Sequence, residues 1–349
     1  MSTTGATSVP AGEAEARTQA TLRFGAGVTA AFVVCEYLQW MPSFLAPVLT
    51  AALLANLPMR PPLKLGVVLV VTMAVASLFA FALASLMRGT PFVLFALVAL
   101  CMLLVFHALL TGRPALPCLL LLICLSIVPV LVMVAPAQAG VLPKALIRGI
   151  ALALVMIWCV YLPWPRKPVP NPPAPAGGAA LATPERRALF STAVMMPLVL
   201  AYLLFGLADV LPVLMGTLMI VVTFDLQGGR MQASRMIVGN IAGGVLGLLI
   251  HSMLLTTPVL PFLALLLFPV LLWFGHHISA GGAGAPVYVI ACNAMLIILG
   301  SAIASGGGSF SLWVTRLLLF TLAGAFAVGM MHLVGHRVFG RRSAAPDPP

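Results

Sequence analysis

One acidic residue lies well inside an apolar stretch of the chain, where a charge is costly. This residue is Glu36, in the segment Val34–Tyr37. A carboxyl group at such a depth can be neutral when its site is closed and charged when water enters, as a proton-coupled carrier requires. Glu36 could equally reach the outer lipid headgroups from a helix end. Ala201 occupies the corresponding position of the second half, so the role is not duplicated.

Two arginines recur at matching depths in the two halves of the chain. Arg148 and Arg316 each lie about one turn inside the outer end of the last apolar stretch of their half. A guanidinium group binds a carboxylate through two parallel hydrogen bonds, which suits an organic-anion substrate. Snorkelling to outer phosphates explains either residue alone. Their recurrence favours substrate binding.

A polar, glycine-containing stretch begins at Asp225 and leads to Arg230 and Arg235. We expect it to form a turn at the inner face of a membrane. Asp225 could pair with either arginine or could carry protons, and pairing is the favoured interpretation.

The strongest local pattern follows this turn and contains Arg235, Gly239, Asn240, Gly243 and Gly247. The three glycines are four residues apart, so they share one helix face and allow another backbone to approach closely. The pattern predicts a helix-packing seam. Arg235, directly before the expected span, is placed to anchor it at the inner leaflet.

The composition excludes a water-soluble protein. Of the 349 residues, 62% are hydrophobic and only 7% are charged. A soluble domain of this size could not bury so much apolar surface. The apolar runs are long enough to span a bilayer as helices, and the alternation typical of a β-barrel is absent. We therefore expect an all-α integral membrane protein, held in the lipid bilayer by about 12 transmembrane helices.

The expected spans fall into two groups of six with similar lengths and spacing. They are Leu22–Trp40, Phe44–Pro58, Leu63–Met87, Phe92–Leu110, Pro117–Ala135, Ala145–Leu162, Ala188–Gly206, Asp209–Phe224, Met236–Leu255, Pro258–Phe274, Ala285–Ala304 and Leu312–Val334.

An internal duplication explains the two groups. The separation between Tyr37 and Tyr202 is nearly the same as that between Arg148 and Arg316. We expect two parallel six-helix repeats, since an even number of spans returns the chain to its starting side. The expected organisation is a disordered N-terminal tail at 1–21, repeats at 22–162 and 188–335, a proline-rich linker at 163–187, and a C-terminal tail at 336–349.

The basic residues predict the orientation, because cytoplasmic loops carry an excess of Lys and Arg. Of the 18 such residues, only Arg88, Lys144, Arg148 and Arg316 fall on the side opposite the N-terminus. Both termini and the linker are therefore expected in the cytoplasm. Contact of these basic residues with the anionic lipids of the inner leaflet explains the net charge of +11. This explanation argues against nucleic-acid binding.

The sequence gives no sign of enzyme chemistry. The six cysteines lie in apolar stretches without metal-ligand spacing, and no HExxH or paired acids occur in the spans. We expect no metal, no cofactor and no enzymatic activity. A membrane-embedded enzyme and a passive channel are the alternatives, and a collapse of transport with the proton gradient would separate a carrier from a channel.

The chain resembles the fusaric acid resistance (FUSC) and aromatic-carboxylate exporter family. The resemblance rests on the two six-span groups, on a proline-containing apolar hairpin around Pro212, and on the Arg-x-x-x-Gly-x-x-x-Gly pattern of Arg235, Gly239 and Gly243. The first half keeps basic residues at Arg60 and Lys64 but lacks the glycine ladder.

The resemblance implies an inner-membrane efflux permease that exports aromatic or other amphipathic organic acids or drugs. It also implies a periplasmic membrane-fusion (adaptor) protein as partner. Proton coupling through Glu36, with Asp225 as the second candidate, fits such a permease. Association into a homo-oligomer is compatible with it.

Overall fold

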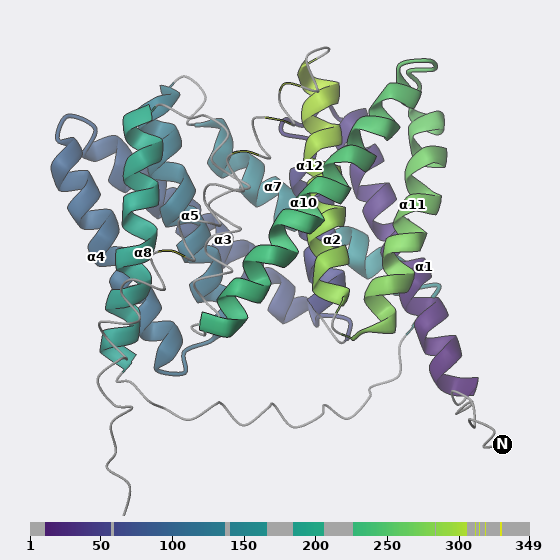
Figure 1. Cartoon of the computed structure of the whole chain (residues 1–349), viewed down its shortest axis with the longest axis horizontal. Helices are drawn as coiled ribbons and strands as arrows, with labels where there is room; N and C mark the ends of the chain where they lie inside the picture. Colours follow the sequence, from purple (N-terminus) through teal and green to yellow (C-terminus); the bar gives the residue numbers. More distant parts are fainter. Residues whose placement is uncertain are drawn as a thin grey trace, which may run out of the picture.

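The computed structural model describes residues 11–56, 59–136, 140–165, 184–205, 226–282 and 284–305, together with single positions beyond them. Ten α-helices and no strands make up this part of the chain (Figure 1). The helices are α1 (Ala11–Tyr37), α2 (Leu45–Asn56), α3 (Leu63–Leu86), α4 (Pro91–Leu110), α5 (Ala115–Val134), α7 (Val141–Val160), α8 (Pro184–Phe205), α10 (Leu226–Leu254), α11 (Leu260–Ala280) and α12 (Ala285–Ser305).

Eight of these helices are long and apolar enough to cross a membrane. The exceptions are α2, which has only 12 residues, and α1, whose first turns are polar. Each described helix overlaps one expected span, so the multi-pass membrane architecture predicted from composition is confirmed. The expected spans 209–224 and 312–334 lie outside the residues described in continuous helices.

Helix α1 begins at Ala11, well before the expected start at Leu22, so residues 11–21 are not part of a disordered tail. This segment is rich in alanine, glutamate and glutamine, which favour helix. The side-chain amide of Gln19 donates a hydrogen bond of 3.2 Å to Glu15, one turn away. The hydropathy of this segment is too low for a membrane span, so the helix start was not predicted, although the helix propensity of the segment is high.

Helices α10 and α8 are among the others that begin earlier than expected. Helix α10 starts at Leu226, so the polar stretch expected as a turn is the first part of a helix. Arg235 therefore lies inside α10 rather than before it. Helix α8 starts at Pro184, with Glu185 in its first turn, and takes the last residues of the expected linker. Proline in the first turn and an acidic residue beside it are typical of helix starts.

Consecutive helices run in opposite directions across the molecule from α1 to α8, and again from α10 to α12 (Figure 1). Helix α1 rises from the end that holds the N-terminus, and α11 descends again beside it (Figure 1). We call the end where α1 starts the N-terminal end and the opposite one the far end. The α10–α11 turn lies at the far end. Of the described basic residues, Arg88, Lys144 and Arg148 belong to the far end by this alternation.

The first helix of each expected half packs on a helix of the other half. Helix α1 packs along α11, and α8 packs along α4. Two further extensive contacts lie within the halves, between α3 and α5 and between α10 and α12. The first helix of each half thus joins the two halves by packing against the other half.

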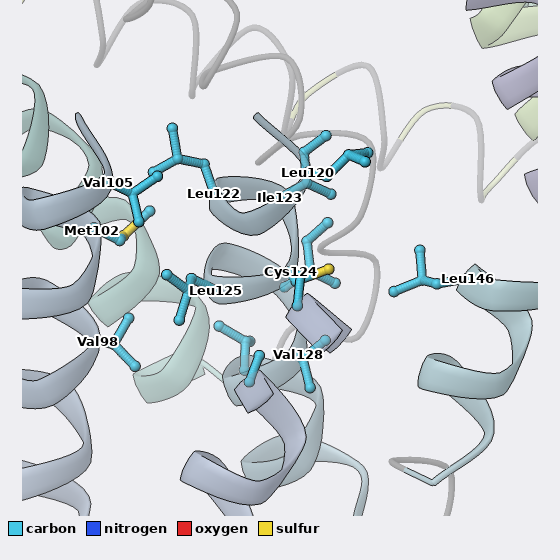
Figure 2. Packing of buried hydrophobic residues seen from close by; sticks show 14 of the residues in the cluster. Val98, Met102, Val105, Leu120, Leu122, Ile123, Cys124, Leu125, Val128 and Leu146 are labelled. Atoms are coloured by element: carbon cyan, nitrogen blue, oxygen red, sulfur yellow. The ribbon is translucent and has the colours of Figure 1, made fainter. Parts of the chain in front are cut away.

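The buried core has two main parts. One involves α3, α4, α5, α7 and α8, with a central layer that includes Met102, Leu122, Cys124 and Leu125 (Figure 2). The other involves α1, α2, α10, α11 and α12. Large apolar side chains such as Val71 and Leu104 remain exposed on the outer faces of α3 and α4. Such faces suit contact with lipid, as expected of membrane helices.

Candidate functional site

Glu36 lies in the last turn of α1 and is half-buried. Its Oε1 atom is buried and accepts no hydrogen bond from any described residue, and the same holds for the Oγ atom of Ser43. The side-chain amide of Gln39 donates to the backbone carbonyl of Glu36 at 2.7 Å and helps to end the helix there. An acidic oxygen without a partner in a buried position is costly, and such groups are concentrated at functional sites.

The Glu36 side chain lines a pocket of about 300 Å³ at the far end of the bundle. The end of α1, the α10–α11 turn and the end of α12 enclose it. Apart from Glu36 and Gln39, the walls are apolar or aromatic; they consist of Tyr37, Leu254, Pro258, Val259, Leu260, Leu263 and Ile303. The pocket, called the Glu36 pocket below, is therefore an apolar cleft with one acidic group.

The α10–α11 turn is shaped locally to provide an apolar wall. Its backbone closes through hydrogen bonds from Thr256 to Met253 and from Thr257 to Leu254. Val259 is extended, with φ −123°, and directly precedes α11. The hydroxyl group of Thr256 donates to the Met253 carbonyl at 2.7 Å and is therefore satisfied within the turn. The apolar side chains are left to face the end of α1.

Three further buried polar atoms lie on the helices that form the pocket. They are Thr29 Oγ1 on α1, His251 Nδ1 on α10 and Asn293 Oδ1 on α12, and none has a hydrogen-bond partner among the described residues. Polar groups buried in a membrane bundle commonly line a ligand or ion route. They are not among the residues predicted from the sequence. Their position inside apolar helices was the available signal, most clearly for His251 at the end of α10.

Arg148 does not line the pocket. It is an exposed residue of α7, and its guanidinium carbon lies 5.5 Å from the centre of the Trp40 ring. This cation–π contact links the start of α7 to the turn between α1 and α2. Sequence reasoning did not identify Trp40 as its neighbour. The other residues proposed with it, Arg316 and Asp225, lie outside the described part of the chain.

The glycine ladder of α10 faces α12. A Cβ atom added at Gly239 would lie 2.8 Å from Ile290, and one added at Gly247 would lie 2.9 Å from the Met295 carbonyl oxygen. At Gly243 it would overlap the carbonyl group of Ala291. The two backbones thus approach as closely as the absence of side chains permits.

The remaining residues of this pattern lie on the same helix. Asn240 is 7% exposed, so it is buried beside the ladder. Arg235 is half-buried nearer the start of α10. Neither belongs to the residues that line the Glu36 pocket. Within the described ranges, no three His, Cys, Asp or Glu side chains are grouped so that they could hold a metal ion.

Comparison with known protein families gives a match to part of the chain. Residues 20–160 match a family model described as a protein of unknown function (DUF2955). The matched region runs from α1 to the end of α7 and includes Glu36, Trp40 and Arg148. No curated protein and no solved structure matches the chain.

Proposed function

We propose that this protein is a proton-driven efflux permease of the inner membrane that exports small amphipathic molecules. The observation that carries the proposal is the Glu36 pocket, in which a half-buried carboxyl group at the end of α1 faces the α10–α12 unit and has a buried Oε1 atom without a hydrogen-bond partner among the described residues. A carrier needs a cleft, a group that titrates inside it, and two bodies that can move relative to each other. The proposed roles of the described elements follow from these three requirements.

The helix contacts support an arrangement of two repeats. If the halves correspond in order, α1 is equivalent to α8, α4 to α11, α3 to α10, and α5 to α12. The contact between α1 and α11 then corresponds to the contact between α8 and α4. In the same way, the contact between α3 and α5 corresponds to that between α10 and α12. Such pairs are expected of parallel repeats related by an axis along the membrane normal. The full twelve-helix layout is part of this proposal.

The orientation in the proposal places the N-terminal end in the cytoplasm. Basic residues such as Arg17, Arg60, Lys64 and Arg113 belong to that end. An excess of Lys and Arg is typical of the cytoplasmic side. The Glu36 pocket then opens on the periplasmic side, where protons enter and an exported molecule leaves.

Glu36 would exchange its proton with the periplasmic solution. Its Oε1 atom has no hydrogen-bond partner among the described residues, which leaves this oxygen available to take up a proton. A rocking motion between the repeats could open and close the cleft around it. Asp225 is retained as the second candidate proton carrier.

The substrate class and partner come from the resemblance to the aromatic-carboxylate exporters. It supports organic acids or drugs as substrates and a periplasmic membrane-fusion protein as partner. For an acid, the proposed anion-binding groups are Arg148 and Arg316. Arg148 would have to leave the ring of Trp40, because its guanidinium group is engaged there.

Efflux from cells that lack the native protein would test this function. We expect expression to increase the export of some members of a panel of aromatic acids and aromatic amines, and an uncoupler to abolish that export. Glu36→Gln removes the titrating group with little change of shape and should abolish the dependence on the proton gradient. Glu15→Gln removes an exposed carboxylate near the other end of the same helix and should have no effect.

Two results would contradict the proposal. Export that continues after the gradient is collapsed would indicate a passive channel. Full gradient-dependent export by the Glu36→Gln variant, at normal protein levels, would remove Glu36 from the mechanism.

A further inference from the structure

The Glu36 pocket combines mostly apolar walls with a single charged side chain. Leu254, Val259 and Leu263 offer apolar surface, whereas Glu36 is the only charged side chain among its described lining residues. No described residue donates a hydrogen bond to the buried Oε1 atom. The complement of this surface is a small apolar body that carries one positively charged hydrogen-bond donor.

An anion fits this pocket less well than a cation. A carboxylate placed beside ionised Glu36 would be repelled, and it could bind only while Glu36 is protonated. The guanidinium group of Arg148 could offset the repulsion, but it lies against Trp40 and is not among the pocket residues. An ammonium group needs no such compensation.

We propose that the Glu36 pocket binds the ammonium group of a small amphipathic amine, whose apolar body rests on the α10–α11 turn. A volume of about 300 Å³ is at the lower end of the usual range for ligand sites, which indicates a molecule with one ring or a short apolar chain. This inference rests on the proposed function for its role in transport, and it names the substrate class of that site.

Direct competition between the amine and a proton follows from this geometry. The ammonium group and the proton use the same carboxylate oxygens, so binding the amine releases the Glu36 proton to the solution and protonation expels the amine. The other groups near the pocket that titrate are Tyr37, which lines it, Cys35, next to Glu36 on α1, and His251, one turn before Leu254 on α10. Arg148 approaches from α7 only as far as the Trp40 ring.

Titration calorimetry on the full-length protein in dodecyl maltoside would test this inference without any transport. The probes are benzylamine, which is protonated near neutral pH, neutral benzyl alcohol and anionic phenylacetate. We expect the cation to bind best. Glu36→Gln should weaken its binding by about tenfold to a hundredfold, the range for losing one hydrogen bond or contact to a charged group. Glu15→Gln should bind like the wild type.

A second variant fills the apolar part of the pocket but keeps the carboxylate. Val259 is 48% exposed, so Val259→Trp should be accommodated by the fold and should reduce binding of the cation. Binding should also weaken as the pH is lowered and Glu36 gains its proton. The His251→Gln variant should keep this pH dependence, whereas Glu36→Gln should lose it.

The same assay can distinguish a lipid headgroup from a soluble amine as the source of the ammonium group. If added phosphatidylethanolamine competes with the probe, the natural ligand is a lipid headgroup; if it does not, the ligand is a soluble amine. Equal binding of phenylacetate and the cation would overturn the inference, as would unchanged binding by Glu36→Gln. Cation binding without any efflux would instead refute the transport function and leave the site intact.

Discussion

The guanidinium group of Arg23 lies over the ring of Tyr161, 4.7 Å from its centre. The Arg23 Nη1 atom also donates a hydrogen bond of 2.7 Å to the carbonyl oxygen of Trp164. Arg23 is only 3% exposed, although it is charged and lies in a membrane protein. Arg23 therefore links α1 to the segment that follows α7. An aromatic ring and a carbonyl group compensate its charge.

Removal of the Arg23 side chain should destabilise the protein. We expect Arg23→Ala to lower the free energy of unfolding by about 2 kcal/mol, because it loses a cation–π contact and a charge-assisted hydrogen bond. Thermal unfolding of the purified protein would measure this. Lys64→Ala removes an exposed basic residue at the same end and should leave the melting temperature unchanged. Equal effects of the two variants would show that the Arg23 contacts are not stabilising.

The glycine seam predicts intolerance to one added methyl group. Gly243→Ala would place its Cβ atom on the Ala291 carbonyl group, so α10 would have to move away from α12. We expect a marked fall in the amount of folded protein in the membrane. The control is Gly89→Ala, since a Cβ atom at Gly89 meets no atom within 4 Å. Fluorescence-detected gel filtration would compare the two, and normal accumulation of Gly243→Ala would contradict the close contact.

The proposed orientation can be tested with two matched threonines at opposite ends of α4. Thr90 precedes the helix and Thr111 follows it; both are exposed, and each hydroxyl group bonds a carbonyl three residues earlier. In a cysteine-free background, Thr90→Cys should react with an impermeant thiol reagent in intact cells. Thr111→Cys should react only after permeabilisation. The reverse pattern would invert the topology.

Arg148 and Trp40 should act as a pair. Trp40→Leu removes the ring on which the guanidinium group rests, and we expect it to cost about 1 kcal/mol of stability. Arg148→Ala should cost a similar amount, and the double variant should cost less than the sum of the two. If Arg148 also binds organic acids, Arg148→Lys should reduce their export less than Arg148→Ala does. Strictly additive unfolding energies would show that the two residues do not interact.

The membrane helices could be predicted because their signal is local. An apolar run such as Pro91–Leu110 needs no distant partner to identify it as a span. The start of α1 was misplaced because its first turns combine low hydropathy with high helix propensity. The start of α10 was misplaced because Gly228 and Gly229 disfavour helix. The glycine ladder was visible as a pattern, but its partner α12 was not, since nothing near Gly243 specifies Ala291.

Only part of the candidate site was accessible from the sequence. Glu36 was conspicuous as an acid in an apolar run. Its pocket depends on the meeting of α1 with the α10–α11 turn, which lies more than half the chain away. The contact of Arg148 with Trp40 likewise joins two segments that no spacing rule relates.

The packing of α1 on α11 has a consequence for how the protein is made. Helix α1 is synthesised first, yet its main neighbour lies near the end of the chain. During translation, the face of α1 that later packs on α11 contacts only lipid until α11 is inserted. The half-made chain therefore lacks the protein neighbour of this face of α1 for most of its synthesis. Premature termination before α11 should yield a fragment that is degraded rather than a stable half-protein.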